Sequence, residues 1–278
     1  MSTMIAPARE TVRAADRVSA ARRHVSPGET LSQTLTMAWR ALKKMRRNPE
    51  QFFDVTFQPV LLTAMFAYIF GGAIAGDVAS YLPLMIPGIL AQTVLTSCMA
   101  TGTQLREDME KGVFDRFKSF PIARIAPLAG PMVADLLRYT IAATLTFCMG
   151  LLLGYRPGGG APGVFAAIVL AIFTGWSLAW VFTWVGTIAR SAQAVQGISM
   201  MILFPLTFLS NAFVPVETLP DWLAAFVKIN PVSHLVTAAR DLANSALVTG
   251  EVAWTVLACL IVITIFAPLS VHSYKRHM

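Results

Sequence analysis

The sequence predicts an all-α integral membrane protein with six transmembrane helices. Three observations lead to this fold class. Of the 278 residues, 55% are hydrophobic and 13% are charged, the mean hydropathy is +0.61, and six long apolar segments alternate with charged or turn-rich stretches. Soluble domains carry about 25% charged residues. A chain with about half that share has too little polar surface to cover a soluble core.

The chain begins with a tail and an amphipathic segment. Residues 1–25 are rich in Ala and Arg, which predicts a disordered cytoplasmic tail. Residues 26–50 predict a helix in the cytoplasmic membrane interface, with an apolar stripe in the lipid and cations near the headgroups. An ordinary positively charged flank is the alternative. The stripe contains Leu31, Leu35, Ala38, Leu42 and Met45, and the residues expected at the interface are Trp39, Arg40, Arg46 and Arg47.

Residues 51–278 predict a six-span transmembrane domain. A membrane helix needs about 20 mainly apolar residues. The apolar segments place the spans at about 52–76, 81–105, 127–155, 163–189, 191–215 and 252–272. We expect no Asp, Glu, Lys or Arg in the cores of these spans. Ion-coupled carriers usually keep an ionisable group in the membrane, so this expectation disfavours that class.

Lysine and arginine residues set the expected orientation. Ten lie in residues 1–54, six in 106–138, one at the 190 turn and two after residue 271, against three in the alternate loops. Cytoplasmic loops carry the excess of Lys and Arg. Both termini are therefore expected in the cytoplasm. The same distribution accounts for the net charge of +7, so no nucleic-acid partner is expected.

The loop after the second span reads EKGVFDRFKSFPIAR over residues 110–124. It predicts an amphipathic helix ended by Pro121, with Val113, Phe117 and Phe120 on one face and charged residues on the other. Aromatic anchors with mixed charges suit a surface that docks a protein partner. A solvated cytoplasmic hairpin is the alternative.

Residues 217–251 precede the last span and are too apolar for a free loop. They predict two short helices, separated at Asn230-Pro231, that dip into the outer leaflet and return. Non-helical backbone at membrane depth is tolerated only when it is buried in protein or lines a wet cavity. Within this segment, His234 is expected to be a structural hydrogen-bonding residue rather than a proton site.

The sequence contains no phosphate-binding loop, nucleophile motif or paired-cysteine metal motif. We therefore expect a transporter subunit that is not an enzyme and binds no cofactor itself, with energy supplied by a partner. Polar and aromatic side chains inside the spans suit a path for an amphipathic solute, although polar contacts between helices are the alternative. The residues expected on this path are Gln92, Thr96, Gln196, Phe204 and Asn211.

From about Leu31 onward the sequence resembles the permease subunit of type-2 ATP-binding-cassette exporters, especially the daunorubicin/doxorubicin-resistance permeases of actinobacteria. The stretches GVFDRF, GYRPGGG, FPLTF, SNAFV and NPVSHLVTA resemble theirs. Two family motifs are also present. They comprise Glu110, Gly112, Arg116, Pro121 and Arg124 after the second span, and Leu219, Pro220, Asn230, Pro231, Ala239 and Arg240 before the last.

The resemblance implies a coupling helix, a re-entrant helical pair and a complex. Two permeases pair, as a homodimer or with a related chain, and two ATP-binding subunits carry ATP and Mg and dock on the cytoplasmic loops. The coupling residues would be Glu110, Gly112, Phe114, Arg116, Phe117, Pro121 and Arg124. The re-entrant motif would contain Pro220, Trp222, Asn230, Pro231 and Arg240.

The function implied is outward transport of a hydrophobic, anthracycline-like drug across the bacterial plasma (inner) membrane. Export of an endogenous lipid, glycolipid or polyketide by the same machinery is the alternative. A membrane-embedded lipid-modifying enzyme is a distant one, because the sequence offers no constellation of nucleophile, base and metal ligands.

Overall fold

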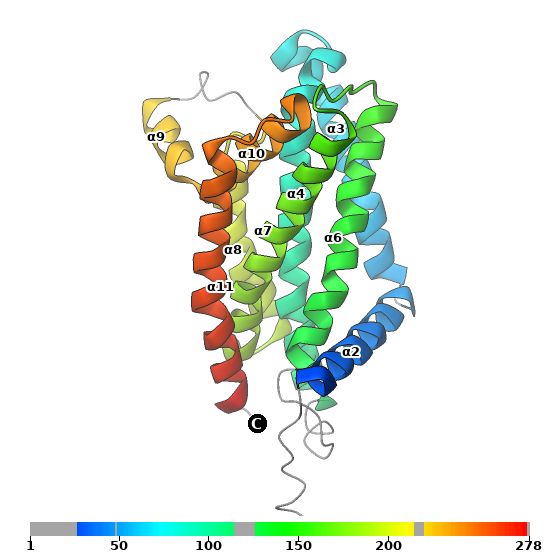
Figure 1. Cartoon of the computed structure of the whole chain (residues 1–278), viewed down its shortest axis with the longest axis vertical. Helices are drawn as coiled ribbons and strands as arrows, with labels where there is room; N and C mark the ends of the chain where they lie inside the picture. Colours follow the sequence, from blue (N-terminus) through cyan, green and yellow to red (C-terminus); the bar gives the residue numbers. More distant parts are fainter. Residues whose placement is uncertain (1–26, 48, 114–125, 214–219, 277–278) are drawn as a thin grey trace, which may run out of the picture.

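The computed structural model describes residues 27–47, 49–113, 126–213 and 220–276, and every regular element in these ranges is an α-helix. Figure 1 shows a bundle of long helices that run roughly alongside one another. α2 lies across one end of the bundle and α10 across the other, and we call these the α2 end and the α10 end. The predicted tail, residues 1–25, lies outside the described residues.

Six helices make up the body of the bundle. They are α3 (Pro49–Ala75), α4 (Val78–Glu110), α6 (Ala126–Leu152), α7 (Gly160–Ile188), α8 (Ala192–Phe208) and α11 (Gly250–Arg276). α4 occupies the centre, since it packs against α3, α6, α7 and α8. α11 packs on α7, at the edge of the bundle. The six segments predicted to be apolar helices are therefore helical.

Five of these helices are long and apolar enough to cross a membrane, judged by length and composition. Their spanning segments are Val55–Ala75, Val78–Glu110, Ala126–Leu152, Gly160–Ile188 and Gly250–Tyr274. α8 is apolar but has 17 residues. It ends at Phe208 rather than at 215, so the predicted extent of the fifth span is wrong. The reason is a distant residue: the Asn230 amide donates hydrogen bonds to the carbonyls of Leu206 (2.8 Å) and Leu209 (3.0 Å), which would otherwise bond to further helical N–H groups.

Two glycines allow α4 and α7 to approach until their backbones touch. A Cβ atom added to Gly102 of α4 would lie 2.1 Å from the carbonyl oxygen of Phe182, and one added to Gly186 of α7 would lie 2.6 Å from the carbonyl oxygen of Gly102. Small residues at such crossings are the usual way for membrane helices to pack closely. This contact fixes the distance between the two helices nearest the centre of the bundle.

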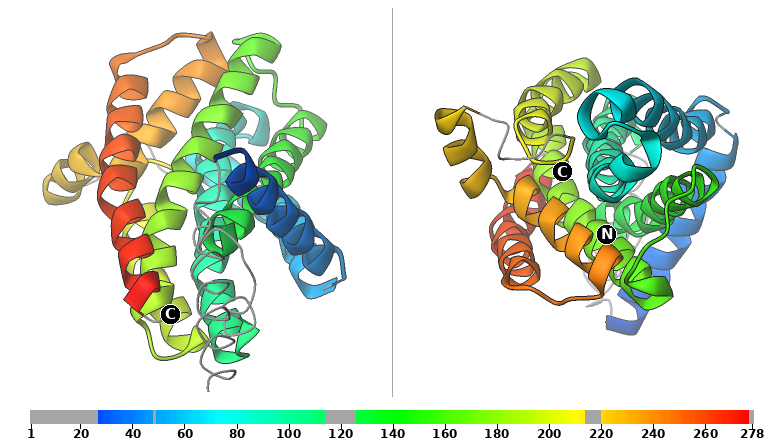
Figure 2. Two further views of the ribbon diagram at one scale, coloured as in Figure 1. Left: turned by 60° about the horizontal axis from the view of Figure 1, so that its bottom comes forward. Right: turned by 90° about the horizontal axis from the view of Figure 1, so that it is seen from above.

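α2 (Pro27–Arg47) is the predicted interface helix, and it lies obliquely against α6 (Figure 2). The prediction of a single apolar face is wrong, because the face is divided between protein and exterior. Ala38 is 4% exposed and packs inward, whereas Leu31, Leu35 and Trp39 are 54–68% exposed. These three exposed residues recur every four positions, so they form one apolar stripe that points away from the protein.

The two short helices predicted near the C-terminus are present. α9 (Asp221–Ile229) and α10 (Pro231–Ser245) meet at Asn230, whose Oδ1 caps α10 by accepting a hydrogen bond from the Val232 N–H (2.9 Å). α10 lies across the end of the bundle and contacts α4, α7 and α11. Asn230 therefore both starts α10 and holds the end of α8.

Side chains of α10 also satisfy backbone groups of α4. Pro87 lacks an N–H, so the carbonyl of Pro83, four residues earlier, has no partner within the helix. The Asn244 amide donates a hydrogen bond to that carbonyl (3.0 Å), and the Tyr155 hydroxyl donates to Oδ1 of Asn244 (2.6 Å). Arg240 donates to the carbonyl of Leu84 (3.2 Å). The proline-containing part of α4 thus depends on α10 for its hydrogen bonds.

Candidate functional site

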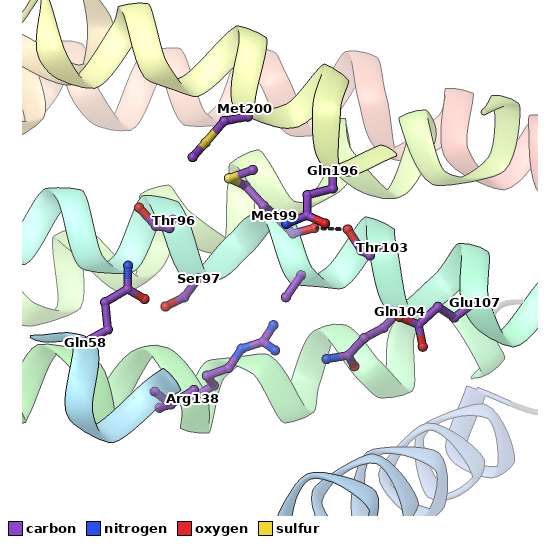
Figure 3. A pocket seen from close by; sticks show the side chains of 12 residues that line it. Gln58, Thr96, Ser97, Met99, Thr103, Gln104, Glu107, Arg138, Gln196 and Met200 are labelled. Carbon is purple, nitrogen blue, oxygen red and sulfur yellow. Dashed lines mark hydrogen bonds between the residues drawn. The ribbon is translucent and has the colours of Figure 1, made fainter. Parts of the chain in front are cut away.

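A cavity of about 330 Å³ lies between α3, α4, α6 and α8, in the half of the bundle nearer the α2 end (Figure 3). We call it the inner cavity. Its walls combine amides, hydroxyls and two charged groups with methionine side chains. The lining residues are Val55, Gln58, Thr96, Ser97, Met99, Ala100, Thr103, Gln104, Glu107, Arg138, Gln196 and Met200.

The hydroxyl groups on the α4 wall donate to their own helix. Thr96 donates to the carbonyl of Gln92 (2.8 Å), Ser97 to that of Thr93 (2.8 Å) and Thr103 to that of Met99 (3.3 Å). Each oxygen keeps accepting capacity toward the cavity. Gln58 reaches in from α3 and Gln196 from α8 (Figure 3). The inner cavity therefore offers both donors and acceptors within an otherwise apolar wall.

A buried ion pair stands behind one wall of the inner cavity. On α6, Nη2 of Arg138 lies 2.6 Å from Oδ1 of Asp135, and the two side chains are 4% and 9% exposed. The Thr101 hydroxyl of α4 donates a hydrogen bond to Oδ2 of the same carboxylate. Both residues fall within the candidate span Ala126–Leu152. The expectation that the span cores contain no charged residue is therefore wrong.

The physical reason is the spacing of the pair. Asp135 and Arg138 lie three positions apart, so they share one helix face and neutralise each other in the bundle interior. The count of Lys and Arg residues had instead assigned Arg138 to the cytoplasmic loop 106–138. Sequence analysis disfavoured an ion-coupled carrier because the spans were expected to be uncharged. The buried Asp135–Arg138 pair removes that argument.

The predicted path residues separate into two groups. Thr96 and Gln196 line the inner cavity, whereas Gln92, Phe204 and Asn211 do not. Phe204 is 53% exposed and stacks on Phe208 with ring centroids 4.4 Å apart. The Asn211 amide donates to the Thr237 hydroxyl (2.8 Å), which ties α8 to α10. The cavity residues that the sequence reasoning missed include Gln58, Arg138 and Met200. Gln, Arg and Met are common throughout helices, so the sequence has no signal that distinguishes these three residues from others of the same type that do not line a cavity.

A second cavity, of about 240 Å³, lies toward the α10 end, and we call it the outer cavity. It is also bordered by α3, α4 and α8, with one residue of α9. Phe66 and Phe213 stack there at a centroid distance of 4.6 Å, and the Tyr81 hydroxyl donates to the Phe213 carbonyl (2.8 Å). The lining residues are Phe66, Phe70, Ile74, Tyr81, Phe208, Leu209, Ser210, Phe213 and Leu223.

The predicted coupling residues are only partly within the described chain. Phe114, Arg116, Phe117, Pro121 and Arg124 lie outside it. Glu110 is the last residue of α4, and the helix ends at a turn in which Gly112 has φ = +65°. Oε1 of Glu110 accepts a hydrogen bond from the Ala192 N–H (3.0 Å), at the first turn of α8. Arg106 donates to the carbonyl of Arg190 (3.0 Å). The end of α4 is thereby joined to the turn between α7 and α8.

The predicted interface residues lie on the outer side of α2. Trp39 is 68% exposed, and Arg46 and Arg47 are exposed near the C-terminal end of the helix. Arg40 borders a surface hollow with three other cations, Lys43, Lys44 and Arg47. Lys44 also forms an ion pair with Asp108 of α4 at 2.9 Å. α2 is therefore tied both to α6 and to the end of α4.

The re-entrant motif residues make most of the contacts at the α10 end. Asn230 joins α8, α9 and α10 as described above. Pro231 is the first residue of α10, a position that suits proline because its missing N–H has no helical partner there. Arg240 donates to the Asn211 carbonyl (2.9 Å) as well as to α4. Pro220 and Trp222 are exposed at the start of α9. Nδ1 of His234 lies 2.5 Å from Oε2 of Glu251, so the side chain joins α10 to α11.

Comparison with known proteins assigns the family. Residues 32–243 match the ABC-2 type transporter family. The chain is 40% identical over 246 residues to the daunorubicin resistance ABC transporter permease protein DrrB1 of Streptomyces coeruleorubidus, covering 88% of this chain and 87% of that protein. It is 28% identical over 189 residues to the doxorubicin resistance ABC transporter permease protein DrrB of Mycobacterium tuberculosis, covering 68% and 65%. Its identity to the probable multidrug ABC transporter permease YbhR of Escherichia coli is 24%, covering 65% and 48%. With its several membrane-length helices, the chain is a multi-pass membrane protein of the ABC-2 type transporter family.

Proposed function

We propose that this chain is the permease subunit of an ATP-driven exporter that moves a hydrophobic, anthracycline-like drug outward across the bacterial plasma membrane. The observation that carries the proposal is the inner cavity, in a chain whose relatives are named as daunorubicin and doxorubicin resistance permeases. Its mixed wall suits an amphipathic ligand, because the methionines and other apolar surface accept the body of the ligand and the polar groups beside them orient it.

The α2 end is the cytoplasmic end in this proposal. Among the described residues, most of the Lys and Arg outside the bundle interior lie at this end, in α2, at the end of α4, at the α7–α8 turn and at the end of α11. α8 then supplies the sixth crossing, since it runs from the α2 end to the α10 end. The inner cavity faces the cytoplasmic half of the membrane, and the aromatic outer cavity faces the outer half. The two cavities would serve entry and release.

Energy would enter at the α2 end from a separate ATP-binding subunit. The sequence has no phosphate-binding loop of its own. Glu110 and Arg106 connect the end of α4 to the α7–α8 turn. A movement of the ATP-binding subunit against this end of α4 would therefore displace α4 and α8, which form two walls of the inner cavity. We propose that two ATP-binding subunits act on two permease chains, which pair through the exposed apolar faces of α3 and α8.

Transport by the assembled complex tests this function. Inside-out vesicles that contain the permease and its ATP-binding subunit should take up daunorubicin when ATP is supplied. Uptake should persist with an uncoupler and stop with vanadate. Vesicles with the permease alone are the control. Uptake that an uncoupler abolishes and vanadate spares would instead assign the chain to ion-driven transport.

Glu110→Gln is expected to weaken coupling without unfolding the chain. The variant loses the carboxylate that accepts from the Ala192 N–H and pairs with Arg106 at 3.4 Å. Because the carboxylate is partly exposed, we expect roughly a threefold to tenfold fall in drug transported per ATP hydrolysed. The matched control is Lys111→Gln on the next residue, whose side chain is 65% exposed and pairs only with Glu107 among the described residues. Equal transport per ATP in both variants would contradict a coupling role for Glu110.

A further inference from the structure

The guanidinium of Arg138 enters the inner cavity with hydrogen-bonding capacity left over. Its Nη2 is close enough to the Asp135 carboxylate for an ion pair, but the two groups are not aligned for a hydrogen bond. Nε and Nη2 have no hydrogen-bond partner within the described chain, although the side chain is 4% exposed. A guanidinium carries five N–H donors in a planar fork. Figure 3 shows the fork pointing from α6 into the cavity toward α4.

Arg138 contributes to the wall of the inner cavity, and the carboxylate of Asp135 does not. Both carboxylate oxygens are engaged, one by Arg138 and one by the Thr101 hydroxyl. A ligand therefore reaches the guanidinium where it borders the cavity, while its positive charge is largely cancelled from behind. The part of the wall next to the guanidinium is suited to acceptor atoms of any charge and ill suited to a cationic group.

Other walls of the cavity complete the pattern. Met99 and Met200 offer adaptable apolar surface. The other charged side chain on the wall, Glu107, lies three turns of α4 from Thr96 and is paired with Lys111 at 3.2 Å. The polar donors and the apolar body of the cavity thus lie next to each other, as an amphipathic ligand requires.

We propose that the inner cavity binds an amphipathic molecule through an oxygen acceptor, such as a carbonyl, carboxylate or phosphate, held by the Arg138 fork. Arg138 is the residue that selects the head group, and Asp135 is a positioning residue that cancels its charge. The apolar body of the ligand lies against the methionines. This inference deepens the proposed function, because it names the chemical class of the exported molecule.

A matched series of fluorescent probes tests the head-group selection. The probes are pyrenebutanoate, its methyl ester and pyrenebutylamine, which share one aromatic body and differ in the head group. Binding to the full-length chain in phosphatidylcholine nanodiscs is followed by fluorescence anisotropy, with empty nanodiscs subtracted. We expect the carboxylate and the ester to bind about tenfold or more tightly than the amine, since hydrogen bonds to a charged donor are strong. Equal affinities for all three probes would overturn the proposal.

Variants of the ion pair separate its two roles. The double variant Asp135→Asn/Arg138→Gln removes both charges and leaves no uncompensated buried ion, so it should fold and bind all three probes about equally. Asp135→Asn alone leaves the cation uncancelled and should raise the affinity for the carboxylate by about tenfold over that for the ester. Arg138→Lys keeps the charge and loses the planar fork, so it should weaken the preference for both acceptor probes over the amine.

Thr140→Ala is the matched control on α6. Its side chain is exposed and its hydroxyl bonds only to the Leu136 carbonyl of its own helix (2.7 Å). It should keep the wild-type order of the three probes. A double variant that elutes as the wild type does and retains the wild-type head-group preference would refute the role of Arg138, whether or not Asp135→Asn folds by itself.

The binding assay uses neither ATP nor a partner, so its outcome is separate from that of the vesicle experiment. Loss of uptake with intact head-group selection would contradict the transport proposal alone. Phosphatidylglycerol nanodiscs distinguish a lipid ligand from another amphiphile. Competition by this lipid in the wild type and not in the double variant identifies an anionic lipid headgroup in the site. Unchanged probe binding identifies a non-lipid amphiphile, and both results keep the acceptor-headed class.

Discussion

Gly102→Ala should destabilise the protein by about 3 kcal/mol, at the upper end of the range for overpacked interiors. The added Cβ would lie 2.1 Å from the Phe182 carbonyl oxygen, which is a backbone atom of α7. No side-chain rotation relieves such a contact, so α4 and α7 must move apart along their crossing. A lower temperature of unfolding, measured by size-exclusion chromatography after heating, is the expected result.

Gly72→Ala is the matched control for this prediction. Gly72 also lies inside a long helix, α3, and a Cβ added to it would meet nothing within 4 Å. Alanine favours a helix over glycine by about 1 kcal/mol at either site. The control should therefore be as stable as the wild type or more stable. A Gly102→Ala protein as stable as the control would show that the α4–α7 crossing is wider than the structure places it.

Asn230→Ala should destabilise the α10 end by roughly 2–4 kcal/mol. The substitution removes the cap of α10 and both hydrogen bonds to the end of α8, and Asn230 is 2% exposed. Loss of an N-cap costs about 0.5–2 kcal/mol, and each other hydrogen bond contributes about 1 kcal/mol. Faster proteolysis at the α8–α9 connection, together with a lower unfolding temperature, would be the measured result.

Asn230→Asp separates the two contributions. Aspartate keeps the oxygen that caps α10 and loses the amide donors to Leu206 and Leu209. It brings a carboxylate toward two carbonyl oxygens, so it should still disturb the end of α8. If Asn230→Asp behaves as the wild type while Asn230→Ala does not, the cap alone matters and the tie to α8 does not.

Local sequence signals predicted the elements that local chemistry determines. The apolar segments gave the long helices of the bundle, because length and hydropathy are properties of the segment itself. The break between α9 and α10 was predicted from Asn230-Pro231, because proline and asparagine favour a helix start at that point.

Helix ends and cavity-lining residues that depend on contacts between distant parts of the chain were not predicted. The end of α8 depends on Asn230, which belongs to another helix. The position of Arg138 in the cavity depends on its pairing with Asp135 and on a hydroxyl from α4, so a count of charges along the sequence assigned it to the cytoplasmic loop 106–138. Thr96 and Gln92 lie one helical turn apart, yet only Thr96 lines the inner cavity. Which turn of a helix faces a cavity is decided by its neighbours.

The hydrogen bonds between α10 and the proline-containing part of α4 join two elements at the α10 end of the molecule. Asn244 and Arg240 provide donors to the carbonyls of Pro83 and Leu84, the first of which the helix cannot satisfy by itself. A bend of α4 at Pro87 and a displacement of α10 therefore share one set of hydrogen bonds and change together. α4 also forms a wall of both cavities. A displacement of α10 would therefore act on α4 first, and α4 extends from there along both cavities.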